Sequence, residues 1–141
     1  MFQGGGESPR LLQMKLTQII NKLKMNLDKR GLVEIRRTNL ALNLLTYLKN
    51  HETGIEFEVV DKYILVNLSM HNIKTIRGYS PFLKYNVREL SALIKQTISK
   101  GSGNLVFSAA ISPHILNHQQ MVESGVGGNL ICYYSRMQSG L

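Results

Sequence analysis

The chain has 141 residues, with one Cys, no Trp and a formal net charge of +8 at pH 7. Hydrophobic residues make up 43% of it, enough for the core of one domain or of two small lobes, so wholesale disorder is excluded. The single Cys132 excludes an internal disulfide and a Cys-rich zinc site. No apolar run approaches the roughly 20 residues of a membrane span, so no membrane partner is expected. Nucleic acid is the usual partner of a small basic domain.

The first half of the chain predicts an α-β-α-β-β lobe over residues 11–70, preceded by a flexible tail at residues 1–10. Apolar residues at helical spacing predict the first helix, with lysines on its polar face. Thr38 or Asn39 has the character of an N-cap for the second helix. Strict alternation over 55–59 indicates a half-buried strand. The expected elements are a helix at 11–26, a strand at 32–35, a helix from 38 or 39 to about 50, and strands at 55–59 and 63–68 joined by a turn at 61–62.

The second half, residues 71–141, predicts a lobe that is mostly β with one helix and one short helical turn. Asn117 and Gln120 have the spacing of a capping box, in which two side chains satisfy backbone N–H groups at the start of a helix. They open the short turn, which ends at Gly125. The expected elements are a strand at 73–77, an extended piece at 83–86, a helix at 88–99, a strand at 105–107, a polar loop at 108–114 and a closing strand at 130–134. The chain is therefore expected to be an α+β fold of two small lobes.

Positive charge is concentrated in residues 71–100, where Glu89 is the one acidic side chain. Residues 101–135 follow as a neutral, glycine-rich segment whose only charged side chain is Glu123. An acidic patch lies in the first half and consists of Glu52, Glu56, Glu58 and Asp61. We therefore expect a nucleic-acid surface on the second half and the first helix, away from the acidic patch.

No pattern in the chain predicts catalysis. His114 and His118 lie four residues apart, but no HExxH glutamate and no nearby third ligand accompany them, so a metal site is not expected. The glycine-rich stretches lack the Lys-Ser/Thr of a phosphate-binding loop. Ser112 has no nucleophile elbow around it, and Cys132 lies in an apolar strand pattern typical of a core residue. We expect no enzyme activity, no cofactor and no small-molecule substrate.

The end of the chain resembles a known family. Residues 123–133, Glu-Ser-Gly-Val-Gly-Gly-Asn-Leu-Ile-Cys-Tyr, closely resemble the C-terminus of the bacterial-type ribosomal protein eight of the small subunit. That family ends in Gly-x-Gly-Gly, an acidic residue, an apolar pair, often Cys, and then Tyr. Residues 11–135 are similar to the family in order and spacing. Residues 80–85, Ser-Pro-Phe-Leu-Lys-Tyr, resemble its Ser-x-Pro-Gly-Leu-Arg-x-Tyr segment with one gap.

Four positions in the loop and after the glycines depart from the family pattern. The family's Ser-Thr-Ser-x-Gly loop is Ala-Ile-Ser-Pro-His at residues 110–114, so only Ser112 matches, with Ala110 in place of Ser, Ile111 in place of Thr and His114 in place of Gly. The acidic residue after the glycines is Asn129. Organellar ribosomes commonly show such divergence. The resemblance therefore implies a mitochondrial ribosome as the location, with the bacterial cytoplasm as the alternative.

In the resembled family, these segments contact a helix in the central domain of small-subunit rRNA. Basic side chains would neutralise phosphates, while short polar residues and glycines would let the backbone approach a distorted RNA helix. Tyr85 or His114 could stack on an unpaired base. The expected RNA-binding residues are Lys15, Lys22, Lys74, Arg77, Lys84, Tyr85, Ser108, Ser112, His114, Asn117, Gly125, Gly127, Gly128 and Asn129. The alternatives are that the helix lysines form only a solvated face and that the glycines only make turns.

These features favour a structural constituent of the ribosome that binds small-subunit rRNA and aids its assembly, in translation. Its partners would be the central-domain rRNA helix and neighbouring small-subunit proteins. The alternative is a protein-interaction module that protein neighbours hold in a larger, organellar ribosomal assembly. Those neighbours would contact the tail and the acidic patch.

Overall fold

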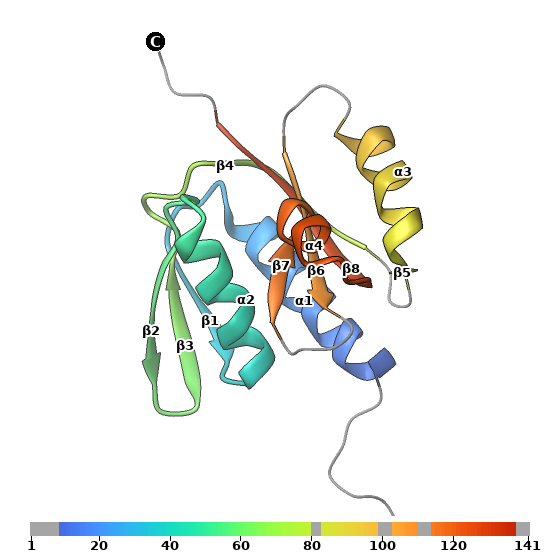
Figure 1. Cartoon of the computed structure of the whole chain (residues 1–141). Coiled ribbons are helices and arrows are strands. Elements are labelled where there is room, and N and C mark those ends of the chain that lie inside the picture. The colour runs from blue at the N-terminus through green and yellow to red at the C-terminus, as the bar shows by residue number, and fades with distance from the viewer. Residues whose placement is uncertain (1–8, 80–82, 99–102, 110–113, 138–141) are drawn as a thin grey trace, which may run out of the picture.

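Two antiparallel sheets and the helices packed around them make an α+β fold of two lobes, as the sequence predicts (Figure 1). The computed structural model describes residues 9–79, 83–98, 103–109 and 114–137, with side chains from residue 16 onward. Of the expected tail, Pro9 and Arg10 fall within this part and already belong to the first helix. Proline is favoured in the first turn of a helix, because an N–H there would lack a partner.

The N-terminal lobe has the expected α-β-α-β-β order and a sheet with the strand order β1-β3-β2. Its elements are α1 Pro9–Asn26, β1 Leu32–Arg36, α2 Asn39–Asn50, β2 Glu56–Val60 and β3 Tyr63–Asn67. Thr38 is the N-cap of α2, because its Oγ1 accepts the N–H of Ala41 at 3.0 Å. Strand β2 is less buried than its alternation predicts, because it lies at the edge of the sheet and Phe57 alone among its residues packs against the core.

The C-terminal lobe contains a sheet with the strand order β4-β8-β6-β7, and β5 also pairs with β8. Its elements are β4 Ile73–Gly78, β5 Lys84–Tyr85, α3 Val87–Thr97, β6 Asn104–Ala109, β7 Ile115–Asn117, α4 His118–Ser124 and β8 Gly128–Arg136. The polar loop expected at 108–114 is shorter than predicted, because Ser108 and Ala109 continue β6. Strand β7 was not predicted, and residues 110–113 lie outside the described part.

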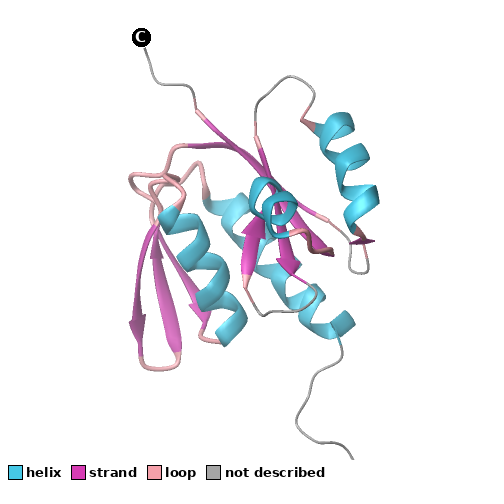
Figure 2. Ribbon diagram, viewed as in Figure 1, coloured by secondary structure: helices cyan, strands magenta, loops and turns pink. Residues whose placement is uncertain are grey.

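The five-stranded sheet is covered on both faces. Val106 of β6 packs with α1 and α2 in a core cluster that the two lobes share. Its neighbours Leu105 and Phe107 point to the other face, where they pack with Leu90 of α3 and Met121 of α4 in a second cluster. Figure 2 shows α4 in front of this sheet and α1 behind it. The lobes are therefore two halves joined by one continuous core.

A bulge in β8 places two consecutive residues on the same face of the sheet. The pairing with β6 passes from Val106–Cys132 to Phe107–Leu130, which leaves Ile131 as the extra residue. Ile131 and Cys132 both belong to the shared core, which confirms that Cys132 is a core residue. Complete burial raises the pKa of its thiol, so it stays protonated and unreactive.

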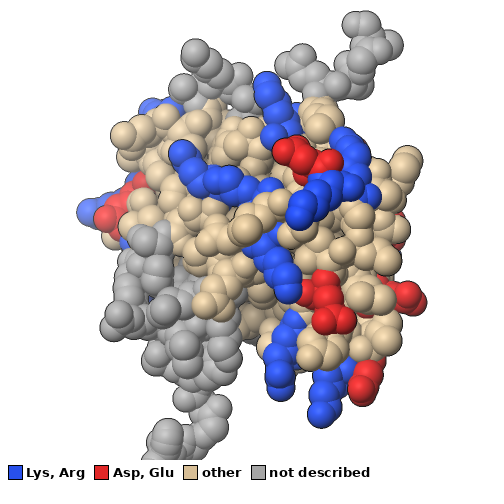
Figure 3. Space-filling model, turned by 180° about the vertical axis from the view of Figure 1, so that it is seen from behind, with Lys and Arg blue, Asp and Glu red and all other residues tan. Residues whose placement is uncertain are grey.

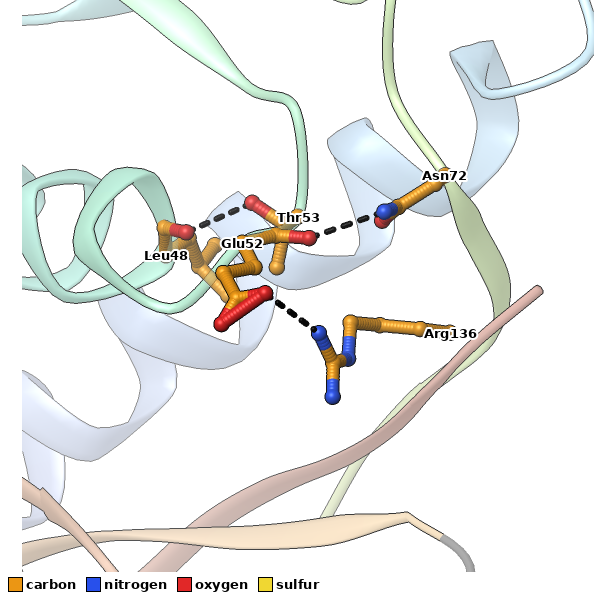
Figure 4. A network of polar contacts seen from close by, with 5 residues as sticks. All are labelled: Leu48, Glu52, Thr53, Asn72 and Arg136. Atoms are coloured by element: carbon orange, nitrogen blue, oxygen red, sulfur yellow. Dashed lines mark hydrogen bonds and ion pairs between the residues drawn. The ribbon is translucent and has the colours of Figure 1, made fainter. Parts of the chain in front are cut away.

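A network of polar contacts joins the lobes where α2, β4 and β8 meet (Figure 4). The Thr53 hydroxyl donates to the Leu48 carbonyl at 2.6 Å, and the Asn72 side-chain amide donates to the Glu52 carbonyl at 2.9 Å. The Arg136 guanidinium pairs with the Glu52 carboxylate at 3.4 Å. The turn after α2 is thus tied to the start of β4 and to the end of β8.

We expect Thr53→Val to lower the free energy of unfolding by about 1–3 kcal/mol, since it leaves the buried Ile55 N–H without its 3.4 Å acceptor. Arg136→Ala, in the same network, should cost less than about 1 kcal/mol, because that ion pair is exposed to solvent. Urea denaturation measures both values. A larger cost for Arg136→Ala than for Thr53→Val would contradict this interpretation of the junction.

Candidate nucleic-acid interface

Three strands meet beside the glycine turn that joins α4 to β8. Asn129, at the start of β8, lies opposite Lys84 of β5 on one side and opposite Ser108 of β6 on the other. Residues that face each other across antiparallel strands project to the same side of the sheet. Lys84, Asn129 and Ser108 therefore form one row, which we call the polar row. None of the three is buried.

Tyr85 projects to the opposite face of the sheet from the polar row. It pairs with Gly128 and packs against the cluster beneath α3 and α4. One side of its ring is thus engaged by the protein, and the residue remains half-exposed. A hollow of about 390 Å³ opens here, lined by Lys84, Tyr85, Asn86, Val87, Glu89, Gly127 and Gly128. The structure thus brings together the predicted residues of β5, the glycine turn and the end of β6.

The glycines allow backbone segments to approach closely within the protein. A Cβ at Gly127 would lie 2.5 Å from the Tyr85 carbonyl oxygen, and one at Gly128 would lie 2.4 Å from the Ser108 carbonyl oxygen. Gly125 ends α4 in the left-handed conformation with φ +66°, where a side chain is strained. The turn alternative therefore has a structural basis at all three positions, whereas RNA contact by the glycines stays a prediction.

Asn117 is turned into the protein. Its Oδ1 accepts the Gln120 N–H at 2.8 Å, and the Gln120 Oε1 accepts the Asn117 N–H at 2.9 Å, which confirms the predicted capping box. The side chain is buried and also contacts the buried Tyr47 hydroxyl. Asn117 therefore serves the fold at this position.

His114 and His118 do not share a helical face. His118 is the first residue of α4, and its buried Nδ1 accepts the Leu105 N–H at 3.3 Å. His114 is exposed just before β7, and its carbonyl accepts the Ala109 N–H at 3.2 Å, so it lies near the Ser108 end of the polar row. His114 also lines a hollow of about 250 Å³ between β7 and α2, together with Asn43, Thr46 and His51.

The remaining predicted cations lie farther from the polar row. Lys22, Lys74 and Arg77 are exposed, and Lys74 lies where β4 pairs with the C-terminal end of β8. Arg77 donates to the Tyr79 hydroxyl at 3.0 Å and lies over its ring. Ser112 and the side chain of Lys15 lie outside the described residues. Figure 3 shows Lys and Arg side chains spread over the rear face of the molecule.

A cationic hollow in the N-terminal lobe was not predicted from the sequence. It has a volume of about 290 Å³ and lies between α1 and β1, where Lys22 and Arg36 flank Gln18 and Thr38. The sequence feature that could have indicated this hollow is the pair Arg36-Arg37, which directly follows the predicted strand at 32–35. The strand carries Arg36 to the sheet edge next to α1, which places it beside Lys22.

Among the described residues, no three His, Cys, Asp or Glu side chains are grouped as metal ligands. The described helices include none that is long and apolar enough to cross a membrane. Neither a protein-family model nor a curated protein matches the chain. Any assignment therefore rests on the polar row, which includes Lys84, and on the exposed cations that lie farther from it.

We expect Gly127→Val to lower the free energy of unfolding by about 2 kcal/mol or more, because the new side chain would meet the Tyr85 carbonyl. Lys24→Ala, on the exposed face of α1, should stay within about 0.5 kcal/mol of the parent chain. Urea denaturation compares the two. Equal stabilities would show that β5 can move away from the glycine turn at no cost.

The stability should also depend on pH through His118. Burial lowers the pKa of His118 from its ordinary value of 6.5, so the folded imidazole stays neutral where the unfolded one is protonated. This contribution is complete above pH 6.5 and is lost as the pH falls below it, at no more than about 1.4 kcal/mol per pH unit. His118→Gln should remove this part of the pH dependence. Identical pH profiles for the two chains would exclude His118 as the titrating group.

Proposed function

We propose that the chain is a structural protein of the small ribosomal subunit that binds a helix in the central domain of its rRNA. It acts by holding the RNA in shape, without catalysis. The ribosome that we propose is a mitochondrial one. The observation that carries the proposal is the polar row beside the glycine turn, because that turn lies in residues 123–133, where the family resemblance is strongest.

The row suits a helical RNA target. A-form RNA presents 2′-hydroxyls and base edges in a wide, shallow minor groove, so proteins recognise it by shape and by close contact. Asn129 and Ser108 have short side chains that can donate and accept hydrogen bonds near the backbone. Long charged side chains at their positions would hold the RNA away, whereas Lys84 at the end of the row can reach a phosphate.

Exposed cations away from the row would supply affinity. Lys22, Lys74 and Arg77 are exposed and can exchange their counterions for phosphates. Contacts of this kind position the RNA without reading its sequence. Affinity and selectivity should therefore reside in different residues, and they can be tested separately.

The primary experiment is a binding titration of the purified chain with the central-domain small-subunit rRNA helix from its own organism, at two salt concentrations. A scrambled duplex serves as the competitor. Tight binding that resists the competitor and weakens steeply with salt supports the proposal. Weak binding, or equal binding to the scrambled duplex, would overturn the rRNA-specific part.

Two variants separate the two kinds of contact. Lys84→Ala should weaken binding to both RNAs alike and reduce the slope of log K against log salt by about 1. Ser108→Ala combined with Asn129→Ala should leave that slope unchanged and lower the preference for the rRNA helix. Lys62→Ala is the matched control for Lys84, because Lys62 is an exposed lysine in the turn between β2 and β3 of the other lobe. A loss of affinity for Lys62→Ala equal to that for Lys84→Ala would indicate general charge attraction.

A further inference from the structure

The sheet of the N-terminal lobe has an uncovered face. Val33 and Val66 point to the side that packs on α1 and α2. The alternate positions point outward, and among the described residues no helix lies over them. Leu32, Val60 and Tyr63 on this outer face are 67%, 45% and 41% exposed.

The same sheet has one open edge. The Arg37 N–H donates to the Lys62 carbonyl, and the Leu68 N–H donates to the Gly31 carbonyl. Because backbone groups alternate in direction along a strand, the even-numbered residues of β3 direct theirs toward β1. The odd-numbered residues of β3 therefore bond to Glu56, Glu58 and Val60 of β2. The backbone groups of Phe57 and Val59 then point away from the sheet, and they meet no hydrogen-bond partner among the described residues.

The opposite edge of the sheet is closed. The Lys22 ammonium group donates to the outward carbonyl of Glu34 in β1 at 2.6 Å. Helix α1 also packs beside β1. An incoming strand therefore finds unpaired backbone groups at β2 and a blocked edge at β1.

The charges around the open edge select the occupant. Glu34, Leu65 and Glu58 face one another across the three strands, and neither of the two carboxylates has an ion pair among the described residues. Arg36, opposite Tyr63, lies on the same outer face, and Figure 3 shows Lys and Arg side chains among the acidic ones, so the anionic character is local to the row of Glu34 and Glu58. Of these two carboxylates, Glu58 lies on the edge strand itself, whereas Glu34 lies two strands farther in. A strand with alternating basic and apolar residues would satisfy the backbone groups of β2, the Glu58 carboxylate and the exposed Val60 side chain together.

A second copy of the chain does not fit the edge. Full antiparallel pairing of β2 with its own copy would place Glu58 directly opposite Glu58. Like charges directly opposite each other in a sheet are destabilising. We propose that β2 is a docking edge at which a basic polypeptide segment of another protein adds a strand to the sheet.

The test uses the full chain labelled with ¹⁵N and a short synthetic peptide of alternating Lys and Val. Saturable shifts should appear at the amides of β2 and should be absent from α4. A Glu-Val peptide should not bind, and a Lys-Val peptide with alternate backbone nitrogens methylated should lose binding, because it cannot donate to Phe57 and Val59. Equal binding of the Glu-Val or the methylated peptide, or shifts confined to the C-terminal lobe, would overturn the proposal.

Charge reversal supplies the variant control. Glu34→Lys combined with Glu58→Lys should weaken the Lys-Val peptide by about tenfold, mainly because the attraction of Glu58 on the edge strand becomes a repulsion, while Glu34 lies two strands farther in. Glu123→Lys, an exposed site on α4, should leave peptide affinity unchanged. The double variant should bind the rRNA helix as tightly as the parent chain does. Failure of the docking-edge proposal is therefore distinguishable from failure of the RNA proposal. Equal peptide affinity in the double variant and in the parent chain would overturn the assigned edge, provided that thermal unfolding shows both to be folded.

Discussion

Strand β8 is buried on both faces, and both the join between the lobes and the candidate RNA site depend on that constraint. It pairs with β4, β5 and β6. Toward its end, the Tyr134 hydroxyl lies 3.3 Å from that of Tyr47 in α2, so the strand is anchored in the core of the other lobe. At its start, Asn129 is held between β5 and β6. Because β8 is paired along its length, Asn129 at its start keeps a defined backbone position although its side chain is polar.

The glycine turn determines how the polar row is formed at that end. The backbone of β5 can approach β8 only because Gly127 has no side chain, and this approach aligns Lys84 with Asn129. The polar row is thus a consequence of backbone packing. The backbone positions of the row are thus set by pairing within the sheet.

The two proposed surfaces lie on different parts of the molecule. The polar row is at the start of β8 in the C-terminal lobe, whereas the open edge is β2 of the three-stranded sheet, where Glu58 lies on the edge strand. Cations are spread over both lobes in a chain of net charge +8, so the unpaired carboxylates of Glu34 and Glu58 are a local feature of that sheet. Because the two surfaces share no residue, both can be occupied in one assembly.

The sequence by itself determined the features that depend on neighbouring residues. The Thr38 cap, the Asn117–Gln120 capping box, the α-β-α-β-β order of the N-terminal lobe and the burial of Cys132 follow from local hydrogen bonding or from apolar periodicity, and all are confirmed. Only the tertiary structure decided the features set by distant segments. These are strand β7, the inward position of Asn117 against Tyr47, the polar row and the open edge of β2. Each depends on which strand lies beside which, and that pairing is chosen by burial of the whole core rather than by any local pattern.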